Sequence, residues 1–251
     1  MSFLPPQWQP SDTELKDRTV LITGAGNGIG RAVALACAKV GAEVLLLGRN
    51  EVGLEAVYDD ILSAGGREAG IIPFDLNTTD PGRYEALAEQ LTETGITLDG
   101  LVHNASVLGE RRLLAQTSPE SWQEVMQVNV SSTFLLTRAL MPLLTHAAPS
   151  SIILTSSGVG RRGKAYWGAY AVSKFATEGY MQVLADELKA ASQIRVNSLN
   201  PGAVNTKMRR TAYPGEQPNT NPSPEALTAY WVYLLSDASQ SLHGETLSAQ
   251  D

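Results

Sequence analysis

The amino-acid sequence predicts a single α/β domain in which a doubly wound parallel sheet is flanked by helices. Apolar, strand-like runs alternate with helical patterns along the chain. These apolar runs lack the strict alternation of a half-exposed strand, so helices are expected to cover both faces of the sheet. A glycine-rich segment also joins the first predicted strand to the first predicted helix, as expected at a strand-to-helix turn.

The first half of the chain is predicted to contain four strands with helices between them. Each predicted strand is an apolar run: residues 17–22, 42–47, 69–75 and 98–103. Helical patterns lie between consecutive strands, over residues 31–39, 51–64 and 81–94. A helix between two strands is the connection that a parallel pair requires.

The second half continues this pattern. A long helical stretch over 119–146 leads to a strand at 151–155, a helix over 167–191 and a strand at 194–199. Ser223 and Pro224 are typical of the cap and first turn of a further helix. We expect residues 1–16 to form an N-terminal extension and residues 17–251 to form the domain.

Composition excludes several classes of function. The 251 residues are 43% hydrophobic and only 18% charged, which is typical of a globular domain with a large core. The net charge of −7 argues against nucleic acid or an anionic membrane as a partner. Cys37 is the only cysteine, so no internal disulfide can form. With no basic, apolar leader and no long apolar span, a soluble cytoplasmic protein is expected.

A metal site is not expected. The histidines, His103, His146 and His243, are far apart in the sequence. No His-Glu-x-x-His motif or cysteine cluster accompanies them. A metal-dependent hydrolase is therefore poorly supported.

The glycine-rich turn spans residues 23–30, with the sequence Thr-Gly-Ala-Gly-Asn-Gly-Ile-Gly. Gly24, Gly28 and Gly30 would let the backbone turn tightly and approach a pyrophosphate, while free N–H groups at the helix N-terminus would bind the anion. The alternative is a glycine turn that binds no ligand. The glycines alone do not decide between the two.

A second motif places Tyr170 four residues before Lys174, with Ser157 thirteen residues upstream of the tyrosine. Residues i and i+4 share one helix face, so the phenol and the ammonium should meet. A nearby cation can lower a tyrosine pKa by about 1–3 units, which would make the phenol a usable acid and base. Alone, the pair would more often be an ordinary tyrosine and a solvated lysine.

Together, these motifs resemble the short-chain dehydrogenase/reductase superfamily. The resemblance runs from about residue 17 to the end of the chain. Within the superfamily, the chain is similar in particular to the 3-oxoacyl-carrier-protein reductases and to a YciK-like bacterial branch. It implies a Rossmann fold and an oxidoreductase that exchanges a hydride between nicotinamide and a carbonyl or secondary alcohol. It also implies a small carbonyl or acyl-thioester substrate, a substrate lid at about 207–224, and a homodimer or homotetramer pairing the helices at 119–146 and 167–191.

The cofactor preference is predicted from the end of the second strand. An acidic residue there would bind a ribose 2′-hydroxyl, whereas an arginine accommodates a 2′-phosphate. The chain has Arg49 and no acid at that strand end, so NADP(H) is preferred. NAD(H) stays possible, because many NADP-dependent relatives carry a basic residue where this chain has Asn27. The alternative for Arg49 is a solvated surface charge.

The resemblance assigns further residues one by one. Ser157 would hold the carbonyl oxygen, Tyr170 would deliver the proton, and Lys174 would lower the tyrosine pKa and bind the nicotinamide ribose. Asn129 would organise a water in the proton relay; its alternative is a buried amide that binds backbone. The positions implied to contact the cofactor are Gly24, Asn27, Gly28, Ile29, Gly30, Arg49, Asp75, Leu76, Asn104, Ala105, Tyr170, Lys174, Pro201, Gly202 and Thr206.

Several alternatives stay open at this point. Asp75 is alternatively a turn residue, and Ser106 stands where the family has glycine. Apolar pocket walls are expected from Leu108, Tyr166, Trp167 and Met208. The basic residues Arg161, Arg162 and Lys164 would meet an anionic carrier or, more simply, form a solvated loop. The alternative function is a cofactor sensor or scaffold of the same fold with little turnover.

Overall fold

Parallel strands form the centre of the molecule. In the computed structural model, which describes residues 3–5, 7–147, 149–217 and 219–250, seven strands lie in the order β3-β2-β1-β4-β5-β6-β7. Their bounds are β1 Thr19–Thr23, β2 Glu43–Gly48, β3 Gly70–Pro73, β4 Gly100–His103, β5 Ser151–Thr155, β6 Arg195–Asn200 and β7 Thr246–Ser248. This is the doubly wound parallel sheet that the sequence predicts.

The strand order reverses beside β1. The chain runs outward from β1 through β2 to β3, then returns to the other side of β1, where β4 pairs with it. The connections after β1 and β4 therefore diverge and leave a crevice at the carboxyl ends of these strands, where ligands bind in open α/β sheets.

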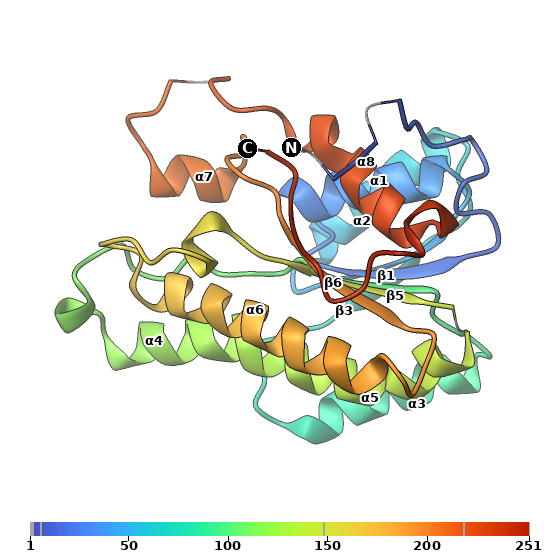
Figure 1. Cartoon of the computed structure of the whole chain (residues 1–251), viewed down its shortest axis with the longest axis horizontal. Helices are drawn as coiled ribbons and strands as arrows, with labels where there is room; N and C mark the ends of the chain where they lie inside the picture. Colours follow the sequence, from blue (N-terminus) through green and yellow to red (C-terminus); the bar gives the residue numbers. More distant parts are fainter. Residues whose placement is uncertain (1–2, 6, 148, 218, 251) are drawn as a thin grey trace.

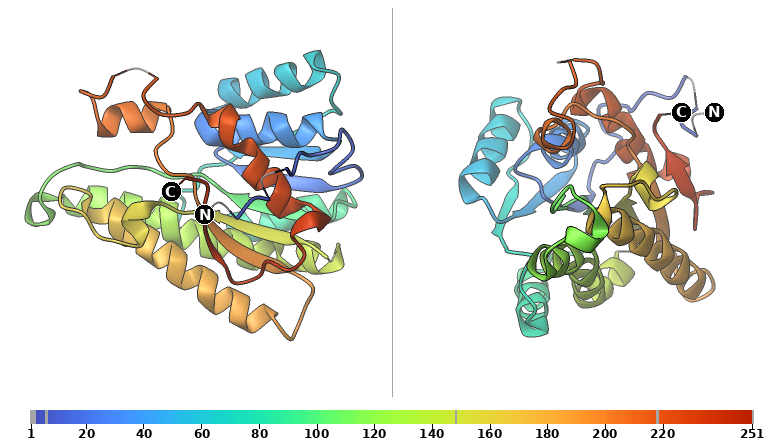
Figure 2. Two further views of the ribbon diagram at one scale, coloured as in Figure 1. Left: turned by 45° about the horizontal axis from the view of Figure 1, so that its top comes forward. Right: turned by 90° about the vertical axis from the view of Figure 1, so that its left-hand side faces the viewer.

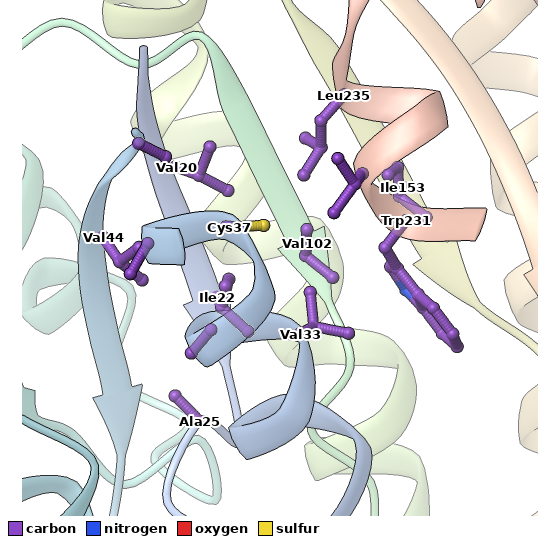
Figure 3. Packing of buried hydrophobic residues seen from close by; sticks show 14 of the residues in the cluster. Val20, Ile22, Ala25, Val33, Cys37, Val44, Val102, Ile153, Trp231 and Leu235 are labelled. Carbon is purple, nitrogen blue, oxygen red and sulfur yellow. The ribbon is translucent and has the colours of Figure 1, made fainter. Parts of the chain in front are cut away.

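One face of the sheet is covered by α1 (Gly28–Lys39), α2 (Glu51–Ser63) and α8 (Thr228–Leu235) (Figure 1). Figure 3 shows valine and isoleucine side chains of the strands meeting Cys37 of α1 and Trp231 of α8. Cys37 and Trp231 are fully buried. Burial raises the pKa of the Cys37 thiol to about 12, so this cysteine is an unreactive packing residue, as its Ala-rich helix suggests.

The other face is covered by α3 (Pro81–Glu93), α4 (Pro119–Met126), α5 (Ser132–His146) and α6 (Gly168–Leu188) (Figures 1 and 2). Leucines of α3, α5 and α6 pack there against β4 and β5. The stretch predicted as one helix over 119–146 is interrupted by a π-helical turn at Gln127–Ser131. Such turns are frequent at functional sites, and this one carries Asn129.

The remaining segments include elements that the sequence analysis did not predict. Helix α7 (Lys207–Ala212) lies inside the expected lid, and the short edge strand β7 follows α8. Single turns of 3₁₀ helix occur at Leu114–Gln116, Gly158–Gly160, Pro224–Leu227 and Asp237–Ser239. Ser223 is the N-cap residue of the 3₁₀ turn that begins at Pro224 and leads into α8, as predicted, although the Ser223 side chain makes no capping hydrogen bond.

The N-terminal extension packs on the domain. Phe3 and Trp8 contact the Tyr233 ring of α8, with ring centroids 6.2 Å and 5.0 Å apart. Leu15 is fully buried, and its N–H donates to the Val40 carbonyl at 3.0 Å. The described part of the extension therefore adds to the core around α8. No described helix is long and apolar enough to cross a membrane.

Candidate active site

A pocket opens at the carboxyl ends of the strands, in the crevice that the strand order creates. It is lined by the glycine turn, the ends of β2, β4 and β5, the first turns of α6, and α7. Of the predicted catalytic and cofactor-contacting residues, all line this pocket except Gly30 and Asn129. Residues scattered over the sequence from Gly24 to Thr206 are thus brought together as predicted.

The glycines of the turn occupy positions where a side chain would be strained or would clash. Gly24 and Gly28 have φ values of +67° and +54°, which favour glycine. A Cβ at Gly30 would lie 2.6 Å from Asn104 Nδ2, so this glycine lets α1 pack closely behind the turn instead of lining the pocket. Asn27 is the N-cap residue of α1; its side chain makes no capping hydrogen bond, and the residue lines the pocket.

Asn104 and Ala105 tie the end of β4 to the end of β1. The Thr23 hydroxyl accepts from both backbone N–H groups, at 2.9 Å and 3.0 Å. The Asn104 side chain donates to the Thr23 carbonyl at 3.1 Å. These bonds hold the loop beside the glycine turn. Ser106 has no positive φ, so the serine that replaces the family glycine does not strain the backbone.

The far end of the pocket carries Arg49 and Asp75. Arg49 is exposed and has no ion-pair partner among the described residues. Asp75 lines the pocket, and its carboxylate also accepts from the Asn77 N–H at 3.0 Å. Asp75 is therefore a turn residue, as the alternative reading expected, and its place in the lining also leaves it near a bound ligand. With no carboxylate at the end of β2, this region suits an anionic group.

Tyr170 and Lys174 lie on one face of α6, as their spacing predicts. The Lys174 ammonium lies 5.5 Å from the centre of the Tyr170 ring and donates to the Thr155 carbonyl at 2.8 Å. Burial lowers the pKa of Lys174 to about 8, and the charge of Glu178 opposes this lowering. The lysine is therefore held at the end of β5, beside the aromatic ring.

The predicted lowering of the Tyr170 pKa is wrong for this structure. Burial raises the pKa of Tyr170 to about 12, although the Ser157 and Ser106 hydroxyls beside it act to lower the pKa. The physical reason is that Tyr170 is buried, and burial disfavours the charged phenolate. Tyr170 is thus a protonated phenol at neutral pH.

The two neighbouring serines have different surroundings. Ser157 lines the pocket beside Tyr170, and its hydroxyl weakly accepts from the Val159 N–H at 3.5 Å. Ser156 also lines the pocket, but its hydroxyl donates to Glu178 Oε1 at 2.6 Å. The choice of Ser157 as the residue that faces a substrate stays a prediction.

Asn129 lies behind the pocket on the π-helical turn. Its side chain accepts from the Val107 N–H at 2.8 Å and donates to the Val107 carbonyl and the Ser173 hydroxyl, both at 3.0 Å. Both amide N–H bonds are therefore used within the protein. Asn129 fixes the 104–109 loop against α6, and its place in a proton relay stays a prediction.

Glu178 was not predicted to belong to the site. It is a buried carboxylate one helical turn after Lys174, and the Ser156 and Ser198 hydroxyls donate to it at 2.6 Å each. Arg161 pairs with it at 3.2 Å. The available signal was its i+4 spacing from Lys174, which places an acid on the helix face that carries Tyr170.

Arg161 is not a surface charge of a solvated loop. Besides Glu178, its guanidinium donates to the Ser248 hydroxyl at 2.8 Å and the Leu247 carbonyl at 2.6 Å. It therefore connects the serine turn to β7. Of the three basic residues in this loop, only Arg162 and Lys164 are left to meet an anionic carrier.

The substrate side of the pocket is formed by Leu108, Trp167 and Met208, three of the predicted wall residues. Tyr166 is 54% exposed, has a positive φ of 69° and does not line the pocket. Thr206 caps α7 through a bond from the Arg209 N–H at 3.1 Å and lies at the pocket edge. Of the proposed lid, Pro218 lies outside the described residues.

No cluster of three or more metal-binding side chains occurs in the described ranges. Two of the histidines have structural partners: His103 Nε2 lies 2.8 Å from the Thr137 hydroxyl, and His243 Nε2 donates to the Ala185 carbonyl at 2.8 Å.

Comparisons with known proteins identify the family. The model of the short chain dehydrogenase family matches residues 18–217. The chain is 45% identical to the uncharacterized oxidoreductase YciK of Escherichia coli K12 over 97% of this chain and 96% of that protein. It is 35% identical to the 3-oxoacyl-[acyl-carrier-protein] reductase FabG of the same strain, over 77% of this chain and 76% of that protein.

A solved structure agrees with the assignment. The short chain dehydrogenase of Shigella flexneri 2a strain 301, complexed with NADP, superimposes with a TM-score of 0.93 at 44% identity, covering 96% of this chain and 100% of that one. The resemblance stated from the motifs is therefore confirmed, and the chain belongs to the short-chain dehydrogenase family.

Proposed function

We propose that this protein is an NADPH-dependent oxidoreductase that interconverts a carbonyl and a secondary alcohol. One observation carries the proposal: Ser157, Tyr170 and Lys174 share a single pocket with the glycine turn and Arg49. A nucleotide held at one end would thus present its reactive end to a proton donor at the other. The oxidoreductase names of the relatives support the same reaction class.

The lining of the pocket suits a dinucleotide. The turn from Gly24 to Ile29 at the start of α1 offers backbone N–H groups for a pyrophosphate. Arg49, lacking a carboxylate partner, would bind a 2′-phosphate, and the NADP bound by the Shigella relative supports that choice. When bound, NADPH would supply the hydride.

Tyr170 would be the proton donor in carbonyl reduction. As the carbonyl is reduced, negative charge develops on its oxygen, and a positioned donor lowers the barrier. A phenol with a pKa of about 12 is protonated at neutral pH and is suited to donating in this direction. Ser157, beside the phenol, would hold the same oxygen. Lys174, already fixed at the end of β5, would bind the nicotinamide ribose.

An NADPH-oxidation screen tests the proposed function. The full-length protein would be assayed with ketones, aldehydes, quinones and 3-oxoacyl thioesters, with Tyr170→Phe as the inactive control. We expect turnover with at least one carbonyl class that depends on Tyr170. Tight NADPH binding without turnover of any class would instead favour the cofactor-sensing alternative.

Cofactor preference can be measured before any substrate is known. If Arg49 binds the 2′-phosphate, this charged contact should contribute about 1.5–3 kcal/mol, or a roughly ten- to hundredfold preference for NADPH over NADH. The double variant Gly48→Asp, Arg49→Ala should shrink or reverse the preference, because a carboxylate repels a phosphate and binds a free 2′-hydroxyl.

Isothermal titration with both cofactors gives the ratio of dissociation constants. The preference should weaken as salt is raised, because Arg49 is exposed. Arg31→Ala is the matched control, since Arg31 also lies near the turn but pairs with Asp60 at 2.7 Å. Equal binding of the two cofactors by the wild-type protein would show that Arg49 is only a surface charge.

We also propose a homodimer or homotetramer, formed through α5 and α6. Of the apolar residues in this part of the sequence, Val125 and Val128 are buried in the core and Leu135 packs against it. Phe134 of α5 is 50% exposed, and Phe175 and Val183 of α6 are 46% and 59% exposed. Exposed apolar side chains on neighbouring helices are typical of an interface.

Light scattering should therefore give a mass of two or four chains at micromolar concentration. Phe134→Glu combined with Phe175→Glu should lower it towards 26.8 kDa, because two charges would be buried in the interface. Val52→Glu, at an exposed site on α2, is the control. A wild-type monomer across this range would contradict the proposal.

A further inference from the structure

Ser106 brings a buried hydroxyl to the part of the pocket that holds Tyr170. The residue lines the pocket, yet its Oγ atom is buried and forms no hydrogen bond of ordinary geometry with any described group. A buried polar group without a partner costs free energy and calls for an explanation. The glycine that the family has at this position would avoid the cost. The serine therefore adds a hydroxyl that no contact within the fold accounts for.

The Ser106 hydroxyl acts on the Tyr170 phenol. Together with the Ser157 hydroxyl, it lies close enough to the phenol to lower the Tyr170 pKa, against the larger and opposite effect of burial. The two serines come from different segments: Ser106 follows β4, and Ser157 follows β5. The phenol therefore has hydroxyl neighbours from two strand ends.

The loop that carries Ser106 is fixed against the helix that carries Tyr170. The Val107 N–H donates to Asn129 Oδ1 at 2.8 Å, and the Asn129 amide donates to the Ser173 hydroxyl at 3.0 Å. The Ser173 hydroxyl in turn donates to the Tyr170 carbonyl at 2.8 Å. This chain of hydrogen bonds begins at the residue after Ser106 and ends at Tyr170. Ser106 is therefore held beside Tyr170 by the fold itself.

Charged groups do not replace the two hydroxyls. The loop at 104–109 and the serine turn at 156–160 contain no ionisable side chain. The ionisable side chains on the other segments around Tyr170 are Arg111, Lys174, Lys207, Arg209 and Tyr213. The Tyr170 pKa responds instead to burial, which raises it, and to the two serine hydroxyls, which lower it. The hydroxyls are thus the groups that favour the phenolate.

A free donor favours the charged form of Tyr170 over the neutral form. When the phenol gives its proton to a substrate oxygen, the phenolate that is left is a strong hydrogen-bond acceptor. A donor already in place stabilises this charge as it develops, without rearrangement at that moment. The Ser106 hydroxyl has no competing acceptor among the described groups. It is therefore free to donate to the phenolate.

We propose that Ser106 is a positioning residue for the proton transfer, whose hydroxyl donates to the Tyr170 oxygen when that oxygen carries negative charge. The inference rests on the proposed function and deepens it, because Ser106 acts through Tyr170. In carbonyl reduction the Tyr170 proton moves to the substrate oxygen, and Ser106 keeps its own proton throughout. In alcohol oxidation the same hydrogen bond would hold the phenolate that accepts the proton.

The titration of Tyr170 tests the inference without a substrate. The full-length protein would carry difluorotyrosine, whose phenol is more acidic than that of tyrosine, and fluorine NMR would follow each ring. Tyr170→Phe identifies the Tyr170 signal by removing it. Ser106→Ala should lower the acid dissociation constant of this phenol about tenfold, as expected for the loss of one hydrogen bond to a charged group. Ser106→Thr keeps a hydroxyl and should stay near the wild-type value.

Thr155→Val is the matched control. The Thr155 hydroxyl is also buried without a partner and its residue lines the pocket, but it is not among the groups that act on Tyr170. This variant should leave the Tyr170 titration unchanged. Ser106→Ala should also melt at or above the wild-type temperature, because it removes a hydroxyl without a hydrogen bond in the resting protein. An unchanged Tyr170 titration in Ser106→Ala, or an equal change in Thr155→Val, would overturn the proposal.

Turnover separates this inference from the proposed function. On a carbonyl that the wild type reduces, Ser106→Ala should lower kcat about tenfold and leave KM within about twofold, because the hydroxyl acts only on the developing charge. If the titration shifts but the wild type reduces no carbonyl, the reductase function fails and the hydrogen bond stands. If carbonyls are reduced and Ser106→Ala keeps the wild-type kcat and pH profile, the reductase function stands and the role of Ser106 is wrong.

Discussion

Replacing Tyr170 with phenylalanine should lower the rate of carbonyl reduction by about a thousandfold, equivalent to ~4 kcal/mol of barrier. The variant removes the only phenol that lines the pocket among the described residues. Its ring still packs against Trp167 and lies beside Lys174, at 5.6 Å and 5.5 Å. NADPH affinity should therefore stay within about twofold of the wild-type value. Steady-state turnover and cofactor titration measure the two effects separately.

Two further variants sharpen this test. Tyr180→Phe removes a phenol from the same helix, away from the pocket, and should keep full turnover. Lys174→Ala should weaken both turnover and NADPH affinity, because Lys174 is expected to bind the nicotinamide ribose as well. Retention of more than a tenth of wild-type activity by Tyr170→Phe would remove the phenol from its assigned role.

The glycine turn and the Tyr170 and Lys174 pair could be predicted from the sequence because each depends on the spacing of residues that are close together in the chain. The Gly24 to Gly30 turn requires backbone conformations that glycine favours, and the Tyr170 and Lys174 spacing corresponds to one helical turn. Apolar runs without alternation indicated strands covered on both faces. These patterns involve residues close together in the sequence, so they can be recognised without knowledge of the three-dimensional structure.

Long-range contacts account for what the sequence could not predict. Arg161 appeared to belong to a solvated loop, but it reaches β7, 87 residues away in the sequence. The pKa of Tyr170 depends on how completely the surrounding segments enclose it, which no spacing along α6 reveals. The edge strand β7 is three residues long and has little apolar pattern of its own. Arg111 meets the ring of Trp167 only because two loops fold together.

Glu178→Ala should strongly destabilise the fold. It removes a buried carboxylate that binds Arg161, Ser156 and Ser198, and it leaves the Arg161 charge without its partner. Breaking a buried pair typically costs about 3–5 kcal/mol. The lower end, about 3 kcal/mol, is expected at this site because Arg161 is 28% exposed. The melting temperature should fall by about 6–12 °C, whereas Glu187→Ala, on the same helix, should change it little.

Glu178→Gln separates charge from packing. The amide fills the same space, so much of the fold stability should be kept, but its neutral side chain no longer raises the pKa of Lys174. That pKa should then fall below about 8, so the ammonium is lost at a lower pH. Any step that needs charged Lys174 should therefore decline at a lower pH than in the wild-type protein. NADPH affinity and turnover measured from about pH 6 to 9 would report the shift. An unchanged alkaline limb in a well-folded variant would mean that Glu178 supports the serine turn alone and has no electrostatic effect on Lys174.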